Sequence, residues 1–125
     1  MMISPAELHD HVLIHEASHI TVANLCGVEK LNVEIKYRGG YAVSGATHYD
    51  CSPDFDHRDL ITIAGIVGEA IFTGSIVPTQ TDLDGFADWK LRDLLALCQQ
   101  AKELLETNTD RLQANLDRFA PKEEL

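Results

Sequence analysis

The segment His15-Glu16-Ala17-Ser18-His19 places two histidines four residues apart, with a glutamate directly after the first. Residues four apart lie on the same face of an α-helix. Both imidazoles can therefore point at one place if this segment is helical. We expect the segment to lie in the second half of a long helix.

The flanking residues predict that this helix covers residues 5–26. Ser4-Pro5-Ala6-Glu7 is typical of a capping box, with proline at the first helical position. Gly27 is a natural left-handed helix end after Cys26. Between these ends, apolar residues recur at helical spacing: Leu8, Val12, Ile14, Ile20, Val22, Ala23 and Leu25.

The segment matches H-E-x-x-H, the helical pattern of zinc peptidases. In this pattern His15 and His19 would bind zinc. Glu16 lies one step round the helix, where it would act on a metal-bound water as the general base. We therefore expect a zinc site with a catalytic glutamate beside it.

A solvated, histidine-rich helix face is the alternative interpretation. The chain has six histidines, and His9 and His11 precede the pattern in the same predicted helix. Ile14 and Ile20 flank the pattern and Ala17 lies within it, and a solvated face would not need these apolar side chains. They favour the metal site.

The remaining residues predict a mainly α fold with four to five helices and one two-stranded β-hairpin. Residues 31–37 alternate as a strand, Arg38-Gly39-Gly40 marks a turn, and residues 41–48 return as a second strand. Gly74 and Thr107-Asn108-Thr109 mark helix ends. The further helices expected are residues 56–72, a helix that begins at Thr81-Asp82-Leu83-Asp84, and residues 110–119.

Composition bounds the class of protein. The 125 residues suffice for one domain, residues 1–125. The net charge of −10, with no run of Lys or Arg, argues against nucleic acid as a partner. Cys26, Cys51 and Cys98 are odd in number and far apart, which suits buried thiols in a reducing, cytoplasmic compartment. No signal peptide is visible.

Residues 60–77 are apolar enough to raise the question of a membrane span. They contain Glu69 and three glycines, and Asp54, Asp56 and Asp59 precede them. A buried helix of a soluble domain explains this pattern better, so we expect no membrane association.

A catalytic zinc site needs a third protein ligand from outside the first helix. The candidates are His48, His57, Glu69, Asp82 and Asp84. Glu69 is a single charge in an apolar helix, where it could instead be a buried carboxylate bonded to a backbone amide or a ligand imidazole. Asp82 opens a helix after a loop, where it could be an ordinary acidic first-turn residue. Residue type and position leave Glu69 and Asp82 as equal candidates.

The order of motifs resembles the peptidase domain of the FtsH-type AAA+ membrane zinc proteases. Residues 14–20 resemble the H-E-A-G-H helix of that family, and residues 33–39 resemble its β-ribbon with an Arg-Gly turn. Residues 63–74 resemble its second helix, residues 81–84 its N-D-L-E segment, and residues 101–108 its C-terminal helices. The similarity covers nearly the whole chain.

The resemblance implies His15, His19 and Asp82 as zinc ligands, Glu16 as base, and Glu69 as a carboxylate outside the ligand set. The chain departs from the family in lacking a G-x-x-x-x-G-K-[ST] motif and a membrane anchor, and in having Ser18 where the family usually has glycine. These features predict an ATP-independent zinc metallopeptidase that cleaves peptide or protein substrates. The edge of residues 41–48 is a candidate for pairing with an extended peptide.

Two rival functions use the same fold. The chain could be a non-catalytic adaptor or inhibitor that binds a peptide or a protease, although binding alone does not require Glu16. Zinc could also be structural, although three protein ligands beside a glutamate fit an open catalytic site better. Oligomeric state does not follow from the sequence.

Overall fold

The structure, a computed structural model, describes residues 3–50, 57–76 and 90–119. Within these ranges the fold is mainly helical, with four helices and one two-stranded antiparallel sheet. The predicted mainly α fold with a single hairpin is therefore confirmed.

Helix α1 spans Pro5–Leu25. It begins where the sequence predicted, because Ser4 Oγ accepts a hydrogen bond from the backbone N–H of Glu7 at 3.1 Å. It ends one residue before the predicted position, and Gly27 then takes a left-handed φ of +93°.

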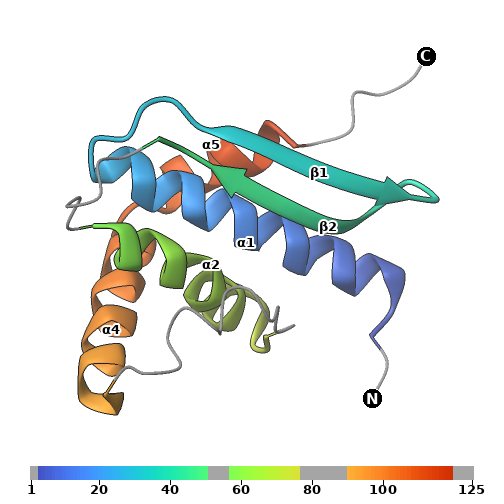
Figure 1. Cartoon of the computed structure of the whole chain (residues 1–125). Coiled ribbons are helices and arrows are strands. Elements are labelled where there is room, and N and C mark those ends of the chain that lie inside the picture. Colours follow the sequence, from blue (N-terminus) through green and yellow to red (C-terminus); the bar gives the residue numbers. More distant parts are fainter. Residues whose placement is uncertain (1–2, 51–56, 77–89, 120–125) are drawn as a thin grey trace.

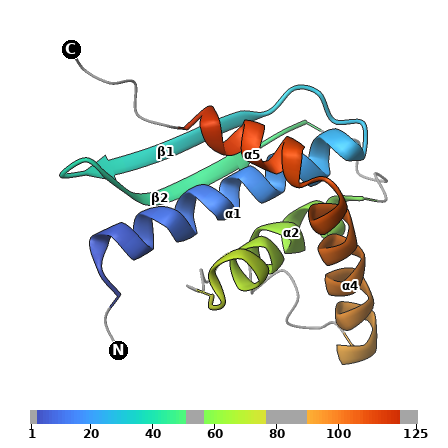
Figure 2. The same cartoon turned by 180° about the vertical axis from the view of Figure 1, so that it is seen from behind.

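Helix α1 is the central element of the fold. The hairpin lies along one side of it and α2 along another, and the view from behind shows α5 crossing it as well (Figures 1 and 2). As a result, all residues from His11 to Ala23 are buried except Val12 and Ile14, which are half-buried.

The hairpin pairs β1 (Asn32–Arg38) with β2 (Tyr41–His48). Gly39 and Gly40 form the turn with φ of +60° and +85°, which glycine adopts without strain. Strand β2 packs on α1: Ala42 is fully buried, and its backbone N–H donates to His9 Nδ1 at 2.8 Å.

The predicted second helix is α2, Arg58–Thr73, which ends at Gly74 with φ +82°. It is buried from Leu60 to Glu69 apart from the half-buried Thr62, as expected for a helix inside a domain. No helix in the part of the chain that the structure describes is long and apolar enough to cross a membrane.

The C-terminal region forms α4 (Leu91–Thr107) and α5 (Thr109–Asp117), separated at Asn108. The break at residues 107–109 is as predicted. The prediction of one continuous helix from Thr81 is wrong, because the backbone of Lys90 is extended (φ −69°, ψ 138°) and Lys90 is the N-cap residue of α4. Residues 81–89 lie outside the described ranges.

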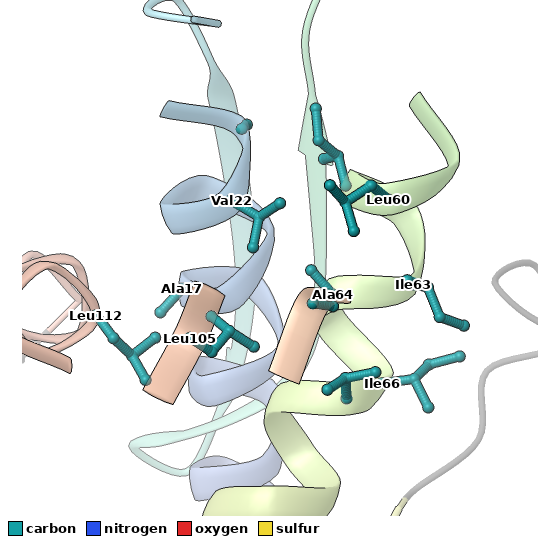
Figure 3. Close-up of a cluster of buried hydrophobic side chains, with 12 residues drawn as sticks. Ala17, Val22, Leu60, Ile63, Ala64, Ile66, Leu105 and Leu112 are labelled. Carbon is teal, nitrogen blue, oxygen red and sulfur yellow. The ribbon is translucent and has the colours of Figure 1, made fainter. Parts of the chain in front are cut away.

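The main hydrophobic core lies between α1, α2 and α4, with α5 at its edge. Figure 3 shows Val22 of α1 and Leu60 of α2 pointing toward one another, and Ala64 of α2 and Leu105 of α4 belong to the same cluster. Cys26 and Cys98 pack against this core as free cysteines, and burial raises the pKa of both thiols. A raised thiol pKa keeps them in the unreactive protonated form, as expected for structural cysteines.

Helices α1 and α2 approach closely at Ser18 and Gly68. A Cβ on Gly68 would lie 1.9 Å from Ser18 Oγ and 2.7 Å from Ser18 Cβ, so no larger residue fits there. Ser18 is fully buried, and its hydroxyl has no hydrogen-bond partner among the described residues. This hydroxyl costs stability, since a buried polar group has lost its bonds to water.

We predict that Ser18→Ala raises the free energy of unfolding by about 1 kcal/mol, because it removes a buried hydroxyl without a partner. Urea titration measures the change. A loss of stability would mean that the Ser18 hydroxyl has a partner. In contrast, Gly68→Ala should cost about 1–3 kcal/mol by overpacking, and Ser18→Gly in the same chain should recover part of that loss.

Candidate metal and catalytic site

Three side chains of α1 converge at one place. One ligand atom from each of His15, Glu16 and His19 lies within 4.8 Å of the other two. All three side chains are buried, with exposed fractions of 6%, 4% and 8%. The alternative of a solvated histidine face therefore does not hold for the pattern. The arrangement of two imidazoles and a carboxylate can hold a metal ion.

The ring of His19 is fixed by the backbone of α2. Its Nδ1 lies 2.7 Å from the carbonyl oxygen of Ile61, in a buried position. A carbonyl only accepts, so Nδ1 carries the proton, and in the neutral ring Nε2 is the nitrogen with a lone pair. Gly65 lies four residues after Ile61 in α2, where a side chain would point back over this carbonyl. Because glycine has no side chain, the His19 ring can reach the carbonyl oxygen.

The ring of His15 is fixed by Glu69. His15 Nδ1–H donates to Glu69 Oε1 at 2.5 Å, and Glu69 Oε2 lies 2.9 Å from His11 Nδ1. Glu69 is 2% exposed. A carboxylate on the far nitrogen of a metal-binding histidine sets its tautomer and orients the ring. His15, like His19, can thus present Nε2 to a metal.

Gly65 leaves room beside both Nε2 atoms. A Cβ at this position would lie 2.6 Å from His15 Nε2 and 2.6 Å from His19 Nε2. The backbone of α2 therefore passes next to the two Nε2 atoms, which lie on the opposite side of each ring from the hydrogen-bonded Nδ1. Any larger residue at Gly65 would occupy that space.

Strand β2 fixes Glu16 from the other side. The hydroxyl of Thr47 donates to Glu16 Oε1 at 2.8 Å. A Cβ on Gly45 would lie 2.8 Å from Glu16 Cγ, so glycine at this position lets the Glu16 side chain lie under the strand. Glu16 is thus held at a set position next to the two imidazoles.

A cleft of about 510 Å³ reaches this cluster. Residues of α1, β2 and α2 line it, and its walls are mostly apolar apart from the clustered side chains. A substrate side chain or peptide segment could therefore approach His15, Glu16 and His19. The polar residues that line the cleft include His11, His15, Glu16, His19, Thr47 and Glu69.

The other predicted candidates lie in different places. His48, at the end of β2, is exposed and lines the cleft. His57 is exposed at the start of α2. Neither belongs to the convergent group found among the described residues. Asp82 and Asp84 lie outside those residues.

The sequence did not indicate several residues that shape the site. His11 had only its spacing of four residues from His15 as a signal. Gly65 was only one of the three glycines within residues 60–77. Thr47 carried no signal, because its contact with Glu16 depends on how the hairpin lies on α1.

Comparison of the chain with known protein families, with curated proteins and with solved structures gave no match.

We predict that Gly65→Ala lowers zinc affinity by roughly 10–100-fold, the effect that disturbing ligand orientation has in other metal sites. The new methyl group would displace two rings that Glu69 and the Ile61 carbonyl hold in place. Competition with a chromophoric chelator measures the affinity.

Val67→Ala is the matched control, because it alters a buried core position of the same helix. It should lose stability and keep its zinc affinity. A folded Gly65→Ala protein that binds zinc as tightly as the unchanged protein would contradict the placement of the metal beside Gly65.

Proposed function

We propose that this protein is an ATP-independent zinc metallopeptidase, with His15 and His19 as zinc ligands and Glu16 as general base. The observation that carries the proposal is the hydrogen bonding of both Nδ1 atoms. It directs both Nε2 atoms to the place where Glu16 also lies.

The donor set fits zinc. Two imidazoles completed by a carboxylate are a typical ligand set of catalytic zinc sites. His15 and His19 supply the imidazoles, and the completing carboxylate is proposed below to be Asp82 rather than Glu16. When bound, zinc would supply Lewis acidity, which lowers the pKa of water far below its usual value and polarises the carbonyl of a substrate. The hydrogen bonds to Glu69 and to the Ile61 carbonyl fix the orientation of the two imidazoles without a metal ion.

The surroundings of Glu16 support the role of general base. Its carboxylate is buried beside the imidazoles and lines the cleft, so it can take a proton from the attacking water and pass it to the leaving amine. The bond from Thr47 keeps one oxygen engaged and so limits rotation of the carboxylate. Glu16 could also serve as a metal ligand, and the variants below distinguish the two roles.

The cleft suits a peptide as substrate. Residues 43–47 of β2 form one wall of it, and β2 pairs with β1 along only one edge. An extended peptide that added to the other edge would lie along the cleft, past Glu16. The net charge of −10 on the chain and the mostly apolar walls of the cleft give no support to nucleic acid as a substrate.

The resemblance to the FtsH-type peptidase domain supports the same proposal, with Asp82 as third zinc ligand. Under this proposal Glu69 orients His15 and leaves the third position to Asp82, which follows the predicted loop. The free, half-buried cysteines are compatible with a reducing compartment, and we propose a cytoplasmic location.

We predict that Glu16→Gln keeps about one zinc ion per chain and loses peptide hydrolysis, because the amide cannot accept the proton. His19→Ala should lose both zinc and hydrolysis. Metal analysis and cleavage of a casein-derived peptide mixture measure the two properties.

Glu34→Gln is the control, since Glu34 is exposed on β1. Loss of zinc from Glu16→Gln would make Glu16 a ligand, and unchanged cleavage would remove it from catalysis. If the unchanged protein binds zinc and peptide but cleaves nothing, the adaptor function replaces the peptidase. If it takes up no zinc, the proposal fails.

A separate prediction concerns the third ligand. Asp82→Ala should raise the dissociation constant for zinc by more than about a hundredfold, beyond the effect of removing an outer hydrogen-bond partner. Asp84→Ala should change it little. The zinc dissociation constant of Glu69→Gln should fall between those of the two aspartate variants. A larger loss of zinc affinity in Asp84→Ala or Glu69→Gln than in Asp82→Ala would contradict Asp82 as the third ligand.

A further inference from the structure

His11 is a buried histidine that the proposed reaction does not use. It lies one helical turn before His15 and is 5% exposed. Its Nδ1 is 2.9 Å from Glu69 Oε2, and its Nε2 is 3.3 Å from Ser75 Oγ. Both ring nitrogens of His11 therefore have partners that come from α2 or directly follow it.

The two contacts determine where the His11 proton lies. A carboxylate oxygen accepts, so Nδ1–H of His11 donates to Glu69. Nε2 of the neutral ring then accepts from the hydroxyl of Ser75. Glu69 thus receives one N–H on each oxygen, from His11 and from His15, which offsets the cost of burying the carboxylate.

The end of α2 is folded so that Ser75 reaches back to His11. Gly74 takes a φ of +82°, which reverses the chain direction. The backbone N–H of Ser75 donates to Thr73 Oγ1 at 3.3 Å, and Thr73 Oγ1 lies 2.6 Å from the Glu69 carbonyl oxygen. Thr73-Gly74-Ser75 therefore forms a turn that is tied to the same helix turn that carries Glu69.

We propose that His11 is a positioning residue of the metal site, acting on the zinc ligand His15 through Glu69. The inference rests on the proposed zinc site. The bonds from His15 to Oε1 and from His11 to Oε2 together hold the Glu69 carboxylate in one plane. The plane of that carboxylate sets the orientation of the His15 ring, and with it the direction of Nε2.

The test compares zinc affinity in the unchanged protein and in His11→Leu, His11→Asn and His9→Leu, by competition with a chromophoric chelator. His11→Leu removes the donor and should raise the zinc dissociation constant about tenfold, the lower end of the effect of outer partners. His11→Asn places an amide N–H near Nδ1 and should stay within about threefold of the unchanged protein.

His9→Leu is the matched control. It removes a histidine from the same helix whose Nδ1 accepts from the Ala42 backbone, and it leaves Glu69 untouched. Its zinc affinity should be unchanged. Equal affinity in His11→Leu and the unchanged protein, equal loss in His11→Asn and His11→Leu, or equal loss in His9→Leu would each overturn the positioning role.

A measurement on the unchanged, metal-free protein keeps the inference testable if His11→Leu does not fold. Long-range ¹H–¹⁵N spectra at mildly alkaline pH should show His11 and His15 as neutral rings protonated at Nδ1. Protonation of His11 at Nε2 would overturn the inference, because Nδ1 could not donate to Glu69.

If the unchanged protein takes up no zinc, the proposed function fails and the inference fails with it. A zinc-binding protein with an indifferent His11 overturns the inference alone.

Discussion

The close contact between α1 and α2 is the constraint on which the rest of the structure depends. Gly68 makes room for Ser18, and Gly65 makes room for the edges of two imidazoles. Because the two glycines have no side chains, the helices can approach closely. Glu69, which directly follows Gly68, then comes within hydrogen-bond distance of His15 and His11. The same contact seals the hydrophobic core between the two helices.

This contact also explains how a helix can be so polar and so buried. His11, His15, Ser18 and His19 all face elements packed on α1, where unpaired polar groups are costly. The three imidazoles are matched by Glu69 and the Ile61 carbonyl, and the hydroxyl of Ser18 is the group for which the described residues provide no partner. Most of the stability cost of the polar face is therefore met by specific bonds, and these bonds orient the candidate ligands.

The site lies between two supports of different kinds. Helix α2 supplies a carboxylate and a carbonyl to the histidines, and β2 supplies the Thr47 hydroxyl to Glu16. The cleft lies between these supports, so a molecule bound in it would contact the strand and the helix together. Orientation of the candidate metal ligands and orientation of the proposed base thus depend on separate elements, and substitutions can address them separately.

Local rules of the sequence were enough to predict the bounds of α1, the hairpin turn and the end of α2. These features act through backbone geometry within a few residues, at Ser4-Pro5, Gly27, Gly39-Gly40 and Gly74. The spacing of His15, Glu16 and His19 likewise placed them together on one helix. The beginning of α4 was not predictable, since apolar spacing continues across Lys90 while the backbone there is extended. Glu69 could not be separated from Asp82 by residue type, and neither Thr47 nor the role of His11 was visible. These depend on which residues of distant segments meet when α2 and β2 pack on α1, and such contacts leave no pattern in the neighbouring sequence.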